Sequence, residues 1–165
     1  MNTSNTHTIS VLVANKPGVL VRIALVFARR GYNIDSLVVS PTVNPKFSRM
    51  TITAKGDPQT LEQIIKNVAK LVDVIHCGEH DMTCSIEKEL ALFKIKASPA
   101  SKAFIKKHSS KYHIKIDDSS QNHLVIEQTG TTAELDEFEV LIKKYNLVEM
   151  VRTGKVLITK GKEST

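Results

Sequence analysis

The sequence of 165 residues has no tryptophan, only two cysteines and no apolar run of the roughly 20 residues that a membrane-spanning helix needs. Its first residues, Met1 to His7, are polar and have neither the basic nor the apolar part of a signal peptide. Two cysteines without an export signal do not suggest a disulfide framework. We therefore expect a cytoplasmic protein with no membrane partner.

The motifs of the common enzyme classes are also missing. The chain contains no G-x-S-x-G, G-x-x-x-x-G-K-[ST], G-x-G-x-x-G or H-E-x-x-H sequence. The paired carboxylates Asp117 and Asp118 fall in a predicted hairpin turn, where aspartate is favoured for local hydrogen bonding. The six histidines have no serine or cysteine partner at a recognisable spacing. We expect no catalytic residue in this chain.

A zinc site is the one metal interpretation that the sequence offers. Its possible ligands, His76, Cys77, His80 and Cys84, fall within nine positions. Their spacing does not repeat C-x-x-C or H-x-x-x-H on both sides of a finger, and neighbouring strand residues such as His76 and Cys77 point in opposite directions. We therefore predict no metal site.

Basic residues exceed acidic ones by 23 to 17, which gives a net charge of +6. The excess is dispersed, with mild clusters at Arg29-Arg30, Lys106-Lys107 and Lys143-Lys144, which are typical of solvated faces or helix C-termini. A nucleic-acid-binding protein would show a basic stripe with interleaved aromatic residues or a recognition helix. The sequence shows neither, so no nucleic-acid partner is expected.

The first half of the chain alternates between strand and helix patterns. Apolar strands at Thr8–Val13, Ile34–Ser40 and Val74–Cys77, and an alternating strand at Ser48–Ala54, surround two helical stripes. The first helix should end at Arg29-Arg30 with Gly31 left-handed, and Asp57-Pro58 should start the second. These helices are predicted from apolar residues at helical spacing: Leu20, Ile23, Ala24, Phe27, Leu61, Ile64, Ile65 and Val68.

The second half repeats this order with unrelated residues. A strand at Leu90–Ala97 precedes a short helix capped by Ser98, and a strand with Tyr112, Ile114 and Ile116 follows. After a turn at Asp117–Asn122 come a strand at Leu124–Gln128 and a helix with a capping box at Thr131 and Glu134. Its apolar face holds Leu135, Phe138, Leu141 and Ile142, and short strands at Val148–Val151 and Val156–Thr159 end the pattern.

The fold class is therefore α+β, with two tandem ferredoxin-like βαββαβ domains at residues 7–80 and 85–160. Two helices would cover one face of each antiparallel sheet. The other face or a sheet edge would stay open, and pairing with a second copy is one way to protect it. We expect a homodimer.

The stretch Asn15-Lys16-Pro17-Gly18-Val19-Leu20 joins the first strand to the first helix. Pro17 suits a first helical turn, and Gly18 has no side chain to keep a ligand from the backbone. The free N–H groups of Gly18, Val19 and Leu20 would favour a carboxylate or phosphate. An ordinary strand-to-helix turn would use the same residues.

Several of these segments together closely resemble one family, the small regulatory subunit of acetolactate synthase, also called acetohydroxyacid synthase. The resemblance is dense over residues 7–78 and looser over 98–128. It is carried by Asn15-Lys16-Pro17-Gly18-Val19-Leu20, Arg22-Ile23, Phe27, Arg29-Arg30-Gly31-Tyr32-Asn33-Ile34, Ser36-Leu37, Ser48-Arg49-Met50-Thr51, Leu71-Val72-Asp73-Val74, Thr129-Gly130 and Arg152-Thr153-Gly154.

The resemblance implies that the first domain is an ACT domain, which binds an amino-acid effector, typically valine, at a dimer interface. Asn15, Lys16, Pro17, Gly18, Val19 and Leu20 would hold the effector, and Asn33 and Ile34 of the facing protomer would complete the site. The chain would carry no cofactor. It would activate a catalytic large subunit holding thiamine diphosphate, Mg and FAD, and would confer feedback inhibition on the first common step of branched-chain amino-acid biosynthesis.

Two alternatives accompany this interpretation. A free-standing ACT-domain amino-acid sensor, acting on nucleic acid, would use the same first domain, and the net charge of +6 is its only support. The strand Ser48-Arg49-Met50-Thr51 either contacts the large subunit or packs only within its hairpin.

Overall fold

The computed structural model describes residues 6–80, 83–162 and 165, so the first five residues of the polar N-terminal stretch lie outside it. The chain divides into two compact units. The first runs up to Glu87 and includes Lys155–Thr165, and the second is Lys88–Gly154. The last strand, β9 (Val156–Thr159), thus groups with the first unit, whereas the sequence placed it in the C-terminal domain at 85–160. The reason is its pairing with β5, whose first residues belong to that unit.

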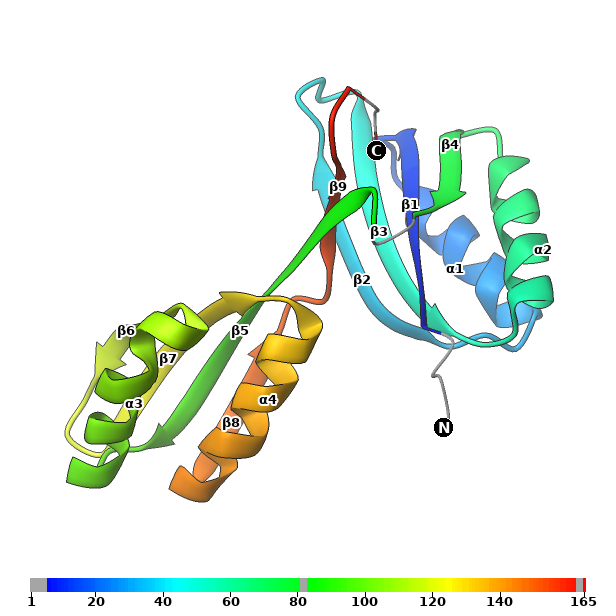
Figure 1. The fold of residues 1–165 in the computed structure, drawn as a ribbon. Coiled ribbons are helices and arrows are strands. Elements are labelled where there is room, and N and C mark those ends of the chain that lie inside the picture. Colours follow the sequence, from blue (N-terminus) through cyan, green and yellow to red (C-terminus); the bar gives the residue numbers. More distant parts are fainter. Residues whose placement is uncertain (1–5, 81–82, 163–164) are drawn as a thin grey trace. The chain divides into compact units, whose positions relative to one another are not determined.

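The first unit has the predicted βαββαβ order. Its sheet has the strand order β2-β3-β1-β4 with antiparallel neighbours, and both helices lie on one face (Figure 1). The elements are β1 (Thr6–Ala14), α1 (Val19–Arg29), β2 (Ile34–Pro41), β3 (Phe47–Lys55), α2 (Pro58–Ala69) and β4 (Val74–Glu79).

Local signals explain these elements. Ile9, Val11 and Val13 alternate along β1 and are at most 1% exposed, because every second residue of a strand faces the helices. The Asp57 carboxylate accepts a hydrogen bond from the amide of Thr60, and Pro58 occupies the first turn of α2, as predicted. Gly31, the residue after the C-cap Arg30 of α1, has φ +70°, also as predicted.

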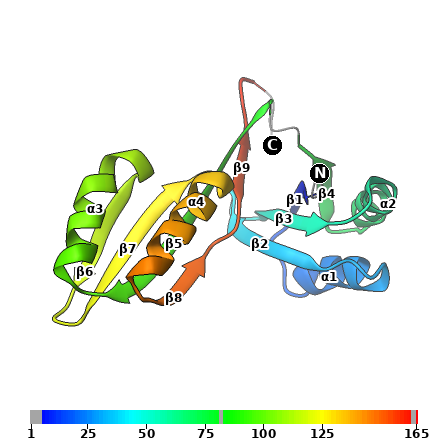
Figure 2. The same ribbon diagram turned by 60° about the horizontal axis from the view of Figure 1, so that its bottom comes forward.

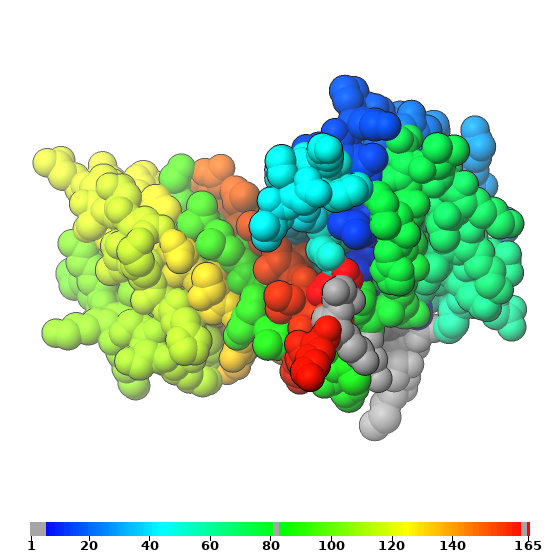
Figure 3. All heavy atoms as spheres, turned by 90° about the horizontal axis from the view of Figure 1, so that it is seen from above, coloured from blue at the N-terminus to red at the C-terminus, as the bar shows by residue number. Residues whose placement is uncertain are grey.

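The opposite face of this sheet is buried although it is polar. Thr8, Ser10, Thr51 and Thr53 are at most 5% exposed. The Nζ atom of Lys155 lies 3.5 Å from the hydroxyl of Thr8, within the first unit. In Figure 3 the red C-terminal segment lies against the green segment that contains the start of β5, as expected for paired strands.

The second unit repeats the order around a sheet with the strand path β6-β7-β5-β8, and α3 and α4 lie on one face of it (Figure 2). Its core joins Phe93, Ile126 and Phe138, all fully buried. The elements are β5 (Ser85–Lys96), α3 (Pro99–Tyr112), β6 (Ile114–Ser119), β7 (His123–Gly130), α4 (Thr132–Ile142), a 3₁₀ turn (Lys143–Tyr145) and β8 (Leu147–Arg152). Two tandem ferredoxin-like units confirm the predicted α+β fold class.

Two local predictions in this unit were wrong. Tyr112 ends α3, which has 14 residues rather than being short, and does not belong to the next strand. Left-handed His113, at φ 49°, separates the helix from β6. Tyr112 alternates with Ile114 and Ile116 in sequence, but from the end of α3 its hydroxyl donates to the Glu137 carboxylate of α4 at 2.6 Å. The strand β6 also continues to Ser119, so the predicted turn at Asp117–Asn122 is shorter.

Candidate functional site

A pocket of about 240 Å³ lies where β1 leads into α1, at the stretch singled out in the sequence. The end of β1, the loop and the first helical turn form one side, and β2 and β3 contribute the other. Its lining residues are Val13, Ala14, Asn15, Lys16, Pro17, Gly18, Val19, Leu20, Val39, Ser48 and Met50.

Gly18 shapes the mouth of this pocket by its backbone conformation. It is the N-cap residue of α1, with φ 81° and no side-chain cap, and its carbonyl accepts the Arg22 amide at 3.1 Å. Since glycine adopts this left-handed region without the steric cost of a Cβ atom, Gly18 is needed for conformation as well as for space. Pro17 precedes the helix instead of forming its first turn, which corrects the sequence-based placement.

The helix start at Val19 determines which amides face the pocket mouth. The N–H groups of Val19, Leu20 and Val21 precede the first intrahelical hydrogen bond, made by Arg22, and have no partner within the helix. Together with the helix dipole, they favour an anionic group at this end. The amides of Gly18, Val19 and Leu20, which the sequence singled out, all precede that bond, and the amide of Val21 is the fourth of this group.

The loop is held from two sides. The Asn15 amide donates to the carbonyl of Lys46 at 2.8 Å, and its side-chain Nδ2 donates to the carbonyl of Pro45 at 3.0 Å. On the other side the carbonyl of Asp73 accepts the Ala14 amide at 2.8 Å, and its carboxylate lies 3.8 Å from Lys16 Nζ. These contacts fix the backbone on which the pocket depends.

The pocket combines an apolar wall with a few polar groups. Val13, Val19 and Met50 are at most 3% exposed and provide hydrocarbon surface. Ser48, which is 5% exposed, Asn15 and Lys16 are the polar side chains that line the pocket with them. Such a site suits a small molecule with one apolar branch and one anionic end.

Six of the eight predicted site residues, Asn15 to Leu20, therefore line one pocket. The other two lie elsewhere in this chain. Asn33 Nδ2 is 3.4 Å from the Asp35 carboxylate, and Ile34 pairs with Ala54 at the far end of β2. Val39 follows Ile34 by five positions along β2, which is about 16.5 Å at roughly 3.3 Å per residue.

Sequence reasoning missed the wall opposite the loop. Val39, Ser48 and Met50 reach the pocket only because β3 lies beside β1 in the sheet and β2 lies beside β3. One signal was present: the alternation of β3 places Ser48 on the same face as Met50, the face that the helices cover. Asp73, which sits just before β4, gave no sequence signal for its contacts with the loop.

The alternative chemical sites are weaker. In the part of the chain that the structure describes, no group of three or more His, Cys, Asp and Glu side chains is arranged to hold a metal. Cys77 packs against the first core, where burial raises the pKa of its thiol to about 11. The ring of His80 is hydrogen-bonded to Ser10 at 2.5 Å, and burial lowers its pKa. Within those described residues, no helix is long and apolar enough to span a membrane.

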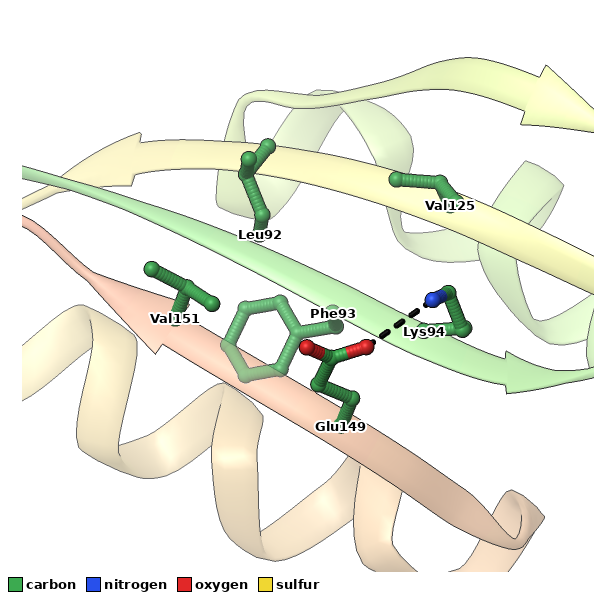
Figure 4. Close-up of a pocket in the computed structure, with 6 residues that line it drawn as sticks. All are labelled: Leu92, Phe93, Lys94, Val125, Glu149 and Val151. Carbon is green, nitrogen blue, oxygen red and sulfur yellow. Dashed lines mark hydrogen bonds and ion pairs between the residues drawn. The ribbon is translucent and has the colours of Figure 1, made fainter.

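A second hollow, of about 230 Å³, lies on the second sheet. Leu92, Val125 and Val151 form an apolar stripe there, beside an ion pair of 2.9 Å between Lys94 Nζ and a Glu149 oxygen (Figure 4). Each charge of this exposed pair already has a partner of opposite sign, so the hollow has no net charge that would favour an anion or a cation.

Comparison with known proteins agrees with the geometry of both units. Residues 9–76 match the family described as AHAS small subunit-like ACT domain, and residues 88–161 match the small subunit of acetolactate synthase. A probable acetolactate synthase small subunit of Archaeoglobus fulgidus is 41% identical over 155 residues, 94% of this chain and 97% of that protein. The isozyme 3 small subunit of Escherichia coli K12 is 38% identical, over 93% of this chain and 94% of that protein.

A solved structure extends the likeness to three dimensions. The crystal structure of the acetolactate synthase small subunit from Thermotoga maritima superposes with a TM-score of 0.85 at 36% identity, covering 96% of this chain and 99% of that one. Sequence, family and fold thus agree over nearly the whole length. The chain belongs to the family of acetolactate synthase small subunits, and its first domain is an ACT domain.

Proposed function

We propose that this chain is the regulatory subunit of an acetolactate synthase, that it activates the catalytic large subunit, and that valine bound in the β1–α1 pocket inhibits the complex. Membership of the small-subunit family supports the regulatory role. The observation that carries the effector site is the pocket itself, where a left-handed glycine begins a helix whose first amides have no partner within the helix, beside a hydrocarbon wall.

Each part of valine has a complementary group in this pocket. The carboxylate would accept hydrogen bonds from the amides of Val19, Leu20 and Val21, which are strengthened by charge. The isopropyl group would lie against Val13, Val39 and Met50. The side-chain oxygen of Asn15, whose Nδ2 is engaged by Pro45, would accept a hydrogen bond from the ammonium group. The binding free energy of related aliphatic amino acids would differ from that of valine by only about 1–3 kcal/mol per methylene group.

A second copy of the chain would complete the site. The strand β2 is at the edge of the first sheet, so its outer backbone groups are open to pairing. If two β2 strands pair antiparallel about a two-fold axis, Asn33 and Ile34 of one protomer approach Val39 of the other. This arrangement explains why these two residues lie far from the pocket within one chain.

Inhibition would follow from linkage. Valine that contacts both protomers stabilises one arrangement of the dimer, and a coupling of about 1–3 kcal/mol to the active complex is typical of such effects. The thiamine diphosphate, Mg and FAD of the reaction would be held by the large subunit. The described residues of this chain offer no carboxylate and imidazole cluster for a metal.

The test is acetolactate formation by a cognate large subunit, with and without this chain, over a valine titration. Activation that valine reverses supports both roles. Activation without inhibition contradicts the valine site, and no activation favours a free-standing amino-acid sensor.

A matched pair of variants locates the site. Gly18→Asp should abolish valine inhibition while activation remains, because a carboxylate would stand where the effector carboxylate binds. Gly31→Asp is the control, since Gly31 is also left-handed, at φ +70°, but lies outside the pocket. If Gly18→Asp left inhibition intact, the site would be wrong.

A further inference from the structure

The second unit contains a larger groove than the effector pocket, between α3 and the strands β6 and β7. Its volume is about 440 Å³, within the range of small-molecule sites. The groove lies wholly in the second unit, so it is separate from the β1–α1 pocket. Its lining residues are Lys102, Ile105, Lys106, Ser109, Ile114, Ile116, Ser119 and Leu124.

The floor of the groove is aliphatic. Ile105 and Leu124 are 2% and 0% exposed and belong to the core of the second unit. Ile116, on the edge strand β6, is 44% exposed at the open side. Half-exposed isoleucine beside a buried aliphatic floor leaves apolar surface that a hydrocarbon chain could cover.

The rim of the groove is cationic. The helix α3 contains four lysines and no acidic residue. Lys111 is paired with Glu137 at 2.9 Å, but Lys102 and Lys106 have no ion-pair partner among the described residues. These two lysines are four positions apart, so they occupy the same helix face and repel each other. An anion between them would relieve that repulsion.

Hydroxyl groups add hydrogen-bonding capacity at the same rim. Ser109 and Ser119 line the groove with the lysines. The Ser109 hydroxyl already donates to the carbonyl of Lys106, so Ser119 is the hydroxyl that would donate to an anion in the groove. No aromatic residue lines the groove, so stacking of a nucleobase is not provided for.

We propose that this groove binds a short-chain aliphatic carboxylate, with its hydrocarbon chain on Ile105, Ile116 and Leu124 and its carboxylate between Lys102 and Lys106. The recessed, buried floor favours a small molecule over a membrane surface, which needs protruding apolar groups. This ligand and site go beyond the proposed valine effector, because they use neither the β1–α1 loop nor the ACT dimer interface.

The test uses the full chain and hexanoate as the probe. We expect saturable binding by isothermal titration calorimetry with a Kd of the order of 1 mM, and chemical-shift changes at the backbone amides of Ile114–Ser119 and Leu124. Hexanamide, which has the same chain without the charge, should bind more weakly. Equal binding of the two probes, or no saturable hexanoate binding, would overturn the proposal.

Variants separate this groove from other cationic surface. Lys102→Gln with Lys106→Gln should weaken hexanoate binding roughly tenfold, because each exposed ion pair contributes a factor of about two to five. Lys107→Gln, on the same helix but outside the groove, is the matched control and should bind normally. Gly18→Asp should also bind hexanoate normally. Loss of hexanoate binding in either control would refute the site. Unchanged binding in the double variant would also refute it, because the probe would then bind elsewhere.

Discussion

The guanidinium of Arg22 in α1 pairs with the carboxylate of Asp73, 51 residues later and just before β4. The same carboxylate lies 3.8 Å from Lys16 Nζ, and the Asp73 carbonyl accepts the Ala14 amide. One residue therefore contacts the strand end, the loop and the helix that surround the candidate effector pocket. Asp73 positions the loop without lining the pocket itself.

We predict that Asp73→Asn weakens valine binding by up to about fivefold, the usual limit for losing a partly exposed ion pair. The loop would keep its sequence but lose two ionic contacts. Calorimetric titration of valine into the full chain measures the change. Glu62→Gln removes an exposed ion pair of 2.6 Å with Lys66 on α2 and should leave valine affinity unchanged. Equal effects of the two substitutions would show that Asp73 has no special role.

The left-handed glycines allow a comparison of stability with binding. Alanine at Gly18 or Gly31 would meet no close atom, the nearest being Arg22 Nη1 at 3.5 Å from the Gly18 position. Both substitutions should therefore lower the free energy of unfolding by about 1 kcal/mol through backbone strain alone. Only Gly18→Ala should also weaken valine binding, because the first amides of α1 would turn away. Urea denaturation and calorimetry measure the two effects, and a parallel loss of valine affinity in Gly31→Ala would contradict the interpretation.

The ring of Tyr32 lies so close to the backbone at position 56 that only glycine fits there without a steric clash. A Cβ atom at Gly56 would come within 2.2 Å of that ring, whose hydroxyl donates to the Asp57 carbonyl at 2.7 Å. We expect Gly56→Ala to destabilise the first unit by about 1–3 kcal/mol, as overpacking does. In a Tyr32→Leu background the same change should cost much less. A double-mutant cycle by urea denaturation measures this coupling, and additive effects would rule out the contact as the cause.

The two cysteines should differ in reactivity. Burial raises the pKa of Cys77 to about 11, so only about one thiol in a thousand is ionised at pH 8. Cys84 is exposed. A chromogenic disulfide reagent at pH 8 should therefore modify one thiol per native chain quickly, and the second only after denaturation. Cys84→Ser should remove the fast phase, whereas a remaining fast phase would mean that Cys77 is accessible.

The capping box of α4 predicts a pH effect. The Glu134 carboxylate accepts the Thr131 amide at 2.7 Å, and this hydrogen bond is the main cause of its lowered pKa. Because the folded pKa lies below the unfolded one, the stabilisation is present above the unfolded value of about 4.3 and is lost as pH falls through the folded value. Glu134→Gln should therefore lower the free energy of unfolding at pH 7 but change it little at pH 3. Urea denaturation at the two pH values measures the difference, and a cost independent of pH would contradict the charged cap.

Much of the fold followed from local patterns. Alternation along β1 and β3 and helical spacing in α1, α2 and α4 identified most of the core. The caps at Asp57, Ser98 and Thr131 marked helix starts within a residue. These features depend on neighbours a few positions away, so the sequence expresses them directly. The strand prediction for Tyr112 was wrong because the local alternation suits a strand, while the hydrogen-bond partner of Tyr112, Glu137, lies on another helix.

The sequence by itself determined the βαββαβ order, the family, and the loop Asn15 to Leu20 that forms one side of the pocket. Only the tertiary structure decided that Val39, Ser48 and Met50 face that loop, that Asp73 holds it, and that Lys102 and Lys106 stand over an aliphatic groove. These relationships join residues distant in sequence. They depend on strand order and on the packing of helices against strands, which no local pattern specifies.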